Sequence, residues 1–187
     1  MVKKQGGNEN VYKKKRCILA SFFFGLILIL TFGGFSFKPS FVLFYFNTTA
    51  SLPRGFYLIL PSREPFEIGD YVVYEPTPET KALALSRHWL QDDELLLKKI
   101  GAMPYNKYVV DPHTLQFYAN GKYIGQVFLS DRMNLPMPVL RGEYEVPDGE
   151  FLPVGDNPRS FDGRYTGTVP IKNIKSKVIP IVTEFHL

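Results

Sequence analysis

Cysteine and histidine are both scarce in this chain, and their scarcity limits the chemistry available to it. The single cysteine, Cys17, excludes an internal disulfide and any metal site built from several cysteine ligands. The three histidines, His88, His113 and His186, are far apart and lack the spacing of metal ligands. We therefore expect neither a metal nor any other cofactor.

Excess positive charge is missing from most of the chain, although the net charge is +4. Residues 1–16 hold six basic residues and one acid, a balance of +5, so the rest of the chain sums to −1. A nucleic-acid binder would carry its basic residues on the folded body. The distribution predicts no nucleic-acid partner and a basic cytoplasmic tail over residues 1–16.

Charge is absent altogether from residues 17–37, a run of 21 residues. A helix of that length reaches about 30 Å, the thickness of a bilayer core. A cleaved signal peptide would have a shorter apolar region ending in small residues, so we expect an uncleaved transmembrane anchor. Six basic residues before the run and only Lys38 directly after it predict a single-pass protein of the cytoplasmic (inner) membrane, with residues 38–187 in the periplasm or its extracytoplasmic equivalent.

Residues 38–187 show the patterns of a mainly β, antiparallel and partly closed domain with one short helix. Thr77-Pro78-Glu79 predicts the helix start, and the helix is expected to end near Gln91 with Ala82, Leu85 and Trp89 on its core face. Residues 41–46 are either a buried first strand or a surface that rests on the membrane. Further strands are expected at 56–60, 71–74, 151–154, 165–171 and, as an edge strand that tolerates Pro180, 177–182.

Two turns are predicted to form hairpins. Asn120-Gly121 supplies both positive φ angles of a type I′ turn within residues 117–124. Pro147-Asp148-Gly149 is expected to turn a second hairpin, whose return strand leads into the loop GDNPRSFDGRY, residues 155–165.

Three segments carry candidate chemistry: NTTASLPRGFY (47–57), LLLKKIGAMP (95–104) and the 155–165 loop. A serine hydroxyl needs an adjacent base to become a nucleophile, and no histidine lies near these segments. Lys98 and Lys99 are the candidate bases. Both have apolar neighbours in a strand, so alternation alone does not choose between them. Whichever acts must be desolvated, because a free lysine has a pKa near 10.4.

Together, and in this order, the three segments resemble the type I signal peptidases, membrane-bound serine proteases with a Ser–Lys dyad. SLPRGFY and SFDGRY look closest to the conjugative transfer (TraF type) signal peptidases. The resemblance implies that Ser51 is the nucleophile and that Lys98, six residues before Pro104, is the base. It also implies that Ser160 orients the lysine amine, and that the Thr49 side chain and the Ser51 backbone N–H form the oxyanion hole.

The other polar residues of the 155–165 loop are expected to support it. Asp162 and Arg164 are predicted to form an ion pair. Asp156 and Asn157 are predicted to fix the loop by Asx-type hydrogen bonds. In one departure from the family, Met103-Pro104-Tyr105-Asn106 replaces Leu-Pro-Gly-Asp, and we expect the turn to persist with Asn106 in place of the acid.

The predicted function is that of a membrane-anchored serine endopeptidase which cuts exported precursors outside the cytoplasmic membrane. Its expected partners are the lipid bilayer and an exported preprotein such as a pilin-like precursor, and the resemblance to the conjugative type implies a pilin matured for conjugation. The alternatives are a general signal peptidase with broad specificity and a non-catalytic, membrane-anchored component of a secretion or conjugation apparatus.

Overall fold

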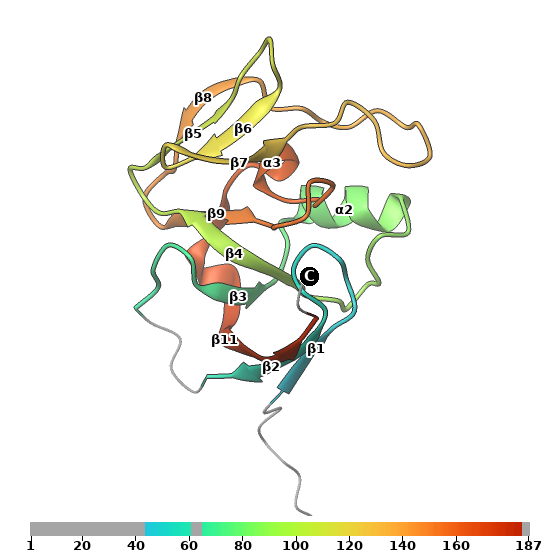
Figure 1. Cartoon of the computed structure of the whole chain (residues 1–187), viewed down its shortest axis with the longest axis vertical. Helices are drawn as coiled ribbons and strands as arrows, with labels where there is room; N and C mark the ends of the chain where they lie inside the picture. The colour runs from blue at the N-terminus through green and yellow to red at the C-terminus, as the bar shows by residue number, and fades with distance from the viewer. Residues whose placement is uncertain (1–43, 61–64, 185–187) are drawn as a thin grey trace, which may run out of the picture. The chain divides into compact units, whose positions relative to one another are not determined.

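The computed structural model describes residues 44–60 and 65–184 (Figure 1). The predicted tail and anchor, residues 1–37, lie outside these residues. Within the described part of the chain, no helix is long and apolar enough to cross a membrane. Antiparallel strands dominate, as predicted, and they are accompanied by the helices α2 (Pro78–Ser86) and α3 (Gly163–Thr166) and a 3-10 turn, Ile171–Asn173.

The strands form two antiparallel sheets, of seven and four strands. The larger has the order β1 (Phe44–Asn47), β2 (Gly55–Ile59), β11 (Ile174–Thr183), β3 (Tyr71–Tyr74), β4 (Leu96–Ala102), β9 (Glu150–Val154), β10 (Val169–Pro170). The smaller has the order β7 (Lys122–Gln126), β6 (Gln116–Ala119), β5 (Lys107–Val110), β8 (Gly142–Glu145). The prediction of a partly closed sheet is wrong, since both sheets are open among the described residues.

Only one of the two predicted hairpins forms. Strands β6 and β7 pair directly, and Asn120 and Gly121 have φ angles of 47° and 73°, as a type I′ turn requires. The prediction of a second hairpin at Pro147-Asp148-Gly149 is wrong, because β8 pairs with β5 whereas β9 pairs with β4 and β10. The turn at Gly149 therefore carries the chain from one sheet to the other.

Strand β11 lies inside the larger sheet, so the edge-strand prediction is wrong. It pairs with β3 from Ile174 to Val178 and with β2 from Val178 to Thr183. Pro180 falls in the half that pairs with β2 alone, beside a register shift. A residue without an N–H is tolerated there because the β3 side of the strand has no ladder at that position.

Helix α2 begins as predicted but ends earlier. The Thr77 side chain accepts a hydrogen bond from the Thr80 backbone N–H, the expected N-cap. The helix stops at Ser86 rather than near Gln91, because His88 adopts a left-handed φ of 56°. His88 N–H then bonds the Leu85 carbonyl and Trp89 N–H the Ala84 carbonyl, the two bonds of a Schellman motif.

The core face predicted for α2 is also wrong. Thr80 and Ala84 are its buried residues, whereas Ala82 is exposed. The strand expected over 165–171 is replaced by α3, the two-residue β10 and the 3-10 turn. The short α3 is capped by the Asp162 carboxylate, which accepts from Arg164 N–H, so the acid of the loop diverts the chain into a helical turn.

Candidate active site

The loop between β1 and β2, which carries Ser51, is organised by the side chain of Asn47. Its Nδ2 group lies 3.1 Å from each of the backbone oxygens of Thr49, Leu52 and Pro53. Its Oδ1 accepts from the backbone N–H of Thr49. Asn47 is buried, and the sequence analysis did not single it out as a site residue. An asparagine entering a turn after a strand was the available signal.

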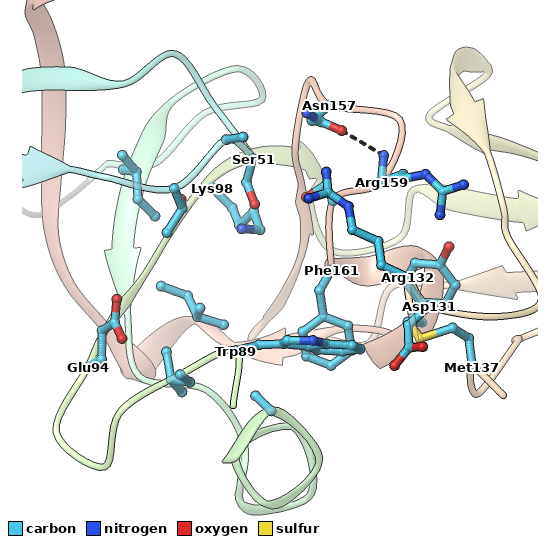
Figure 2. Close-up of a pocket in the computed structure, with 18 of the residues that line it drawn as sticks. Ser51, Trp89, Glu94, Lys98, Asp131, Arg132, Met137, Asn157, Arg159 and Phe161 are labelled. Carbon is cyan, nitrogen blue, oxygen red and sulfur yellow. Dashed lines mark hydrogen bonds between the residues drawn. The ribbon is translucent and has the colours of Figure 1, made fainter. Parts of the chain in front are cut away.

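Ser51 connects this loop to the 155–165 loop. Its carbonyl accepts hydrogen bonds from the backbone N–H groups of Asp156 (2.9 Å) and Asn157 (3.2 Å). Its side chain lies in a pocket of about 300 Å³, whose wall also contains Lys98 and Ser160. Figure 2 shows the Ser51 and Lys98 side chains pointing into this pocket. The fold thus brings together the three residues predicted from separate segments.

Ser160 packs directly against Gly155. A Cβ at position 155 would lie 2.2 Å from Ser160 Oγ and 2.9 Å from the Ser51 carbonyl oxygen, so only glycine fits. Ser160 is buried, and its Oγ has no hydrogen-bond partner among the described residues. A buried hydroxyl without a partner is costly in a folded protein. This one is therefore free to bond a group that enters or moves within the pocket.

Lys98 is almost completely buried on β4, opposite Val72 of β3. Burial lowers the pKa of its amine to about 8. The charge of Asp162 acts against burial and raises the pKa of Lys98. The charge of Arg164 lowers the pKa of Lys98. Burial is the largest of the three effects, and the pKa is therefore lowered overall. With this pKa, roughly one tenth of the Lys98 amine is neutral at pH 7 and about half at pH 8.

Lys99 lies in the opposite electrostatic situation. Its Nζ lies 2.6 Å and 2.9 Å from the two carboxylate oxygens of Asp156 and 5.0 Å from the ring centroid of Tyr71. Burial by itself lowers the pKa of Lys99, but the hydrogen bond and the charge of Asp156 outweigh it and leave the pKa raised. Lys99 is thus held as a cation. The predicted Asx-type role of Asp156 is wrong, because among the described residues its carboxylate pairs with Lys99 instead.

Asp162 and Arg164 form a fully buried ion pair within the 155–165 loop. Arg164 Nε lies 2.8 Å from Asp162 Oδ1, and Nη2 lies 3.1 Å from Oδ2. Asp162 Oδ2 also accepts from Gly155 N–H at 2.7 Å. The guanidinium further donates to the carbonyls of Gln126 and Pro158. This pair holds both ends of the loop and its link to β7.

Asn157 and Thr49 use their side chains locally. Asn157 Oδ1 accepts from Arg159 N–H at 2.8 Å, an Asx-type bond (Figure 2). The Thr49 hydroxyl donates to Asn47 Oδ1 at 2.8 Å. Thr49 would therefore have to turn its hydroxyl to donate to an oxyanion, and its assignment stays a prediction.

The turn after β4 keeps its shape without the family residues. Asn106 N–H donates to the Met103 carbonyl, and Asn106 Oδ1 accepts from Met103 N–H. Tyr105 adopts a left-handed φ of 67° where the family pattern has glycine. The side chain of Asn106 thus occupies the place expected for the acid.

Aromatic and aliphatic side chains form the rest of the pocket wall. The Trp89 and Phe161 rings lie 5.1 Å apart between their centroids, and Leu95, Leu97 and Met137 add apolar surface. We expected Trp89 to serve core packing only, but it lines the pocket (Figure 2). An apolar pocket that holds a hydroxyl and a buried amine is able to bind and attack a peptide.

The fold and this site fit the class of serine peptidases. Residues 15–183 match the family described as signal peptidase, peptidase S26. Because the match covers most of the 187 residues, the chain belongs to the signal peptidase family, whose members are serine peptidases that cleave signal peptides from preproteins. This finding confirms the resemblance at the level of the family.

Similarity to individual proteins is low. A solved signal peptidase I from Enterococcus faecalis V583 matches with 18% sequence identity and a TM-score of 0.37, covering 62% of this chain and 98% of that chain. No curated protein matches this chain.

Proposed function

We propose that this chain is a membrane-anchored endopeptidase that cleaves exported preproteins with Ser51 as the nucleophile and Lys98 as the general base. One observation carries the proposal: the pocket that contains Ser51 also contains a buried lysine amine whose pKa is lowered to about 8. The neighbouring Lys99 is held as a cation by Asp156 and is unsuited to accept a proton.

The reaction follows from these protonation states. Neutral Lys98 takes the Ser51 proton while Oγ attacks the scissile carbonyl, and the resulting ammonium gives that proton to the leaving amine. An acyl ester on Ser51 remains. Water, deprotonated by the same lysine, then attacks the ester and releases the second product.

Three further groups are proposed to assist. The Ser160 hydroxyl, which has no hydrogen-bond partner in the described part of the chain, is proposed to bond the Lys98 amine and orient it. The Ser51 N–H and a rotated Thr49 hydroxyl are proposed to stabilise the oxyanion. The buried Asp162–Arg164 pair is proposed to hold the loop rather than to take part in proton transfer.

Exposed apolar side chains support a location at the surface of the cytoplasmic membrane. Phe44, Phe46, Phe56, Ile181 and Val182 are each at least 49% exposed and lie on the adjacent strands β1, β2 and β11. Such patches mark interaction surfaces. A membrane anchor at residues 17–37 would concentrate the site near tethered substrates. A reporter fused after Leu187 should be active only outside the cytoplasm, and activity inside would contradict this topology.

For the substrate, the SLPRGFY and SFDGRY segments favour a pilin-like precursor, by their resemblance to the conjugative transfer type. A general signal peptidase would have the same chemistry with a broader clientele. Incubating the purified full-length chain with prepilins and with ordinary preproteins, and measuring product masses, separates the two.

The same assay tests the proposal itself. Wild-type chain should yield two products from one bond, and Ser51→Ala should yield none. If wild type binds precursors but cleaves none of them, the non-catalytic alternative holds instead.

A further inference from the structure

Part of the segment between β7 and β8, residues 128–137, forms a rim at one side of the pocket and is held by side-chain hydrogen bonds. Asp131 organises it: its Oδ1 accepts from the N–H groups of Met133 and Leu135, and its Oδ2 pairs with Arg87. Arg87 also donates to the Pro136 carbonyl. All these bonds fix the backbone on both sides of Arg132, so this arginine is presented from a defined position.

A second arginine approaches the same rim from the 155–165 loop. The Arg159 guanidinium lies 4.3 Å from the ring centroid of Phe128, and its backbone N–H is held by Asn157. Arg132 and Arg159 both line the main pocket and also an adjoining cavity of about 460 Å³ that contains Ser130. Figure 2 shows both arginine side chains on the side of the pocket away from Glu94.

The charges of this rim do not balance. Asp131 is neutralised by Arg87, Asp156 by Lys99 and Asp162 by Arg164. Among the described residues, neither Arg132 nor Arg159 forms an ion pair. The remaining carboxylate that lines the pocket, Glu94, accepts from the Gln91 N–H.

We propose that Arg132 and Arg159 form a specificity subsite that binds an acidic side chain of the precursor near its cleavage site. The inference rests on the proposed peptidase function. A guanidinium binds a carboxylate through two parallel hydrogen bonds, and Asp and Glu are the residues of a peptide that supply this group internally. Partial exposure weakens each pair, so the expected preference for an acid is moderate, about three- to tenfold in kcat/KM.

The test uses a set of fluorescence-quenched peptide substrates, all based on the cleavage site of one precursor, and measures the kcat/KM of their cleavage. Each carries Glu, Ala or Lys at a single position within reach of the scissile bond, and the full-length chain is assayed on all of them. At one position wild type should prefer Glu over Ala by about three- to tenfold, and salt should reduce this ratio. In the Arg132→Ala/Arg159→Ala variant the Glu/Ala ratio should fall to about 1, and in Arg132→Glu/Arg159→Glu, Lys should become the preferred residue.

Arg141→Ala is the matched control, because Arg141 is an exposed arginine directly before β8 and does not line the pocket. Its Glu/Ala ratio should equal that of wild type. A preference for Glu that survives in the double-alanine variant, or no preference at any position, overturns the subsite.

A binding measurement keeps this result separate from the proposed chemistry. Ser51→Ala should bind the Glu peptide more tightly than the Ala peptide by fluorescence anisotropy, and replacement of both arginines should remove the difference. If wild type cleaves no peptide but this difference appears, the peptidase proposal fails and the subsite stands. If cleavage occurs and binding shows no difference, only the subsite fails.

Discussion

The Lys99 amine lies 2.6 Å from the Asp156 carboxylate, while the amine of Lys98, the adjacent residue, lies buried in the pocket that contains Ser51. Adjacent residues of a strand face opposite sides of the sheet. In β4 this alternation gives two lysines opposite protonation behaviour, with one pKa lowered and the other raised. The two adjacent lysines therefore have different roles, Lys98 in the pocket and Lys99 in an ion pair.

Replacing each lysine by alanine should separate these roles. Lys98→Ala should reduce kcat/KM by about 10²–10⁴-fold, the usual contribution of a general base. Lys99→Ala loses a partly exposed ion pair worth about 0–1 kcal/mol, so activity should fall less than about tenfold. Initial rates on one precursor give both values. An inactive Lys99→Ala together with an active Lys98→Ala would show that the register is wrong.

Lys98 should also reduce stability. Its pKa of about 8, against an ordinary value of 10.5, corresponds to roughly 3 kcal/mol at neutral pH, so Lys98→Met should raise the free energy of unfolding by up to that amount. Between pH 8 and 10.5 the unfolded chain binds more protons than the folded one, so wild type gains stability as pH rises through that window and the difference disappears above it.

Urea unfolding of both chains across this pH range provides the measurement. Lys99→Met is the control, and it should be slightly destabilised by loss of the Asp156 pair. A Lys98→Met variant less stable than wild type at pH 7 would mean that the buried amine has a stabilising partner.

Alanine substitutions of Ser160 and Gly155 should differ in their effects on stability. Ser160→Ala should lower kcat by roughly tenfold, through loss of the hydrogen bond that we propose forms to the Lys98 amine during the reaction. Stability should not fall, because the hydroxyl has no partner among the described residues. Gly155→Ala should reduce both activity and stability, since the new Cβ would displace Ser160 and the Ser51 carbonyl. Gly121→Ala is the control for lost stability alone: its Cβ meets nothing within 4 Å, but its φ of 73° strains a turn that does not line the pocket, so stability should fall while activity is kept. Unchanged turnover in Ser160→Ala would reduce Ser160 to a packing role.

The Asp162–Arg164 pair should be strongly coupled. Removing one partner leaves a buried charge unpaired, at a cost of about 3–5 kcal/mol. Thermal unfolding of Asp162→Ala, Arg164→Ala and the double variant should therefore show a large interaction energy. The exposed Lys107–Glu143 pair is the control and should couple by less than about 1 kcal/mol. Additive effects at Asp162 and Arg164, with full stability but no activity in Asp162→Ala, would place the acid in the chemical step.

Local patterns predicted the elements that depend on neighbouring residues. The start of α2 at Thr77 and the Asn120-Gly121 turn are each specified by adjacent side chains and followed the prediction. The end of α2 depends on His88 adopting a conformation that glycine usually supplies, and on Arg87 pairing with Asp131. No local signal marks either event.

Long-range pairing explains the remaining differences. Pro180 indicated an edge strand. The pairing between β11 and β3 stops at Val178, so the second half of β11, which contains Pro180, pairs with β2 alone. Alternation along β4 left Lys98 and Lys99 equivalent, because both have apolar sequence neighbours. The Asp156 carboxylate, contributed by a loop 57 residues after Lys99, distinguishes the two lysines in the fold. The role of Asn47 likewise depends on the closed geometry of the β1–β2 loop.

The pH dependence of kcat/KM tests the central claim most directly. The substrate should be a precursor without charged residues near its cleavage site. If neutral Lys98 is the base, kcat/KM on it should rise with pH through a pKa of about 8 and then reach a plateau. Lys98→Arg should be inactive across the whole range, because a guanidinium does not lose its proton in a protein. A wild-type rate that is flat from pH 6 to 10, or measurable cleavage by Lys98→Arg, would contradict a lysine base.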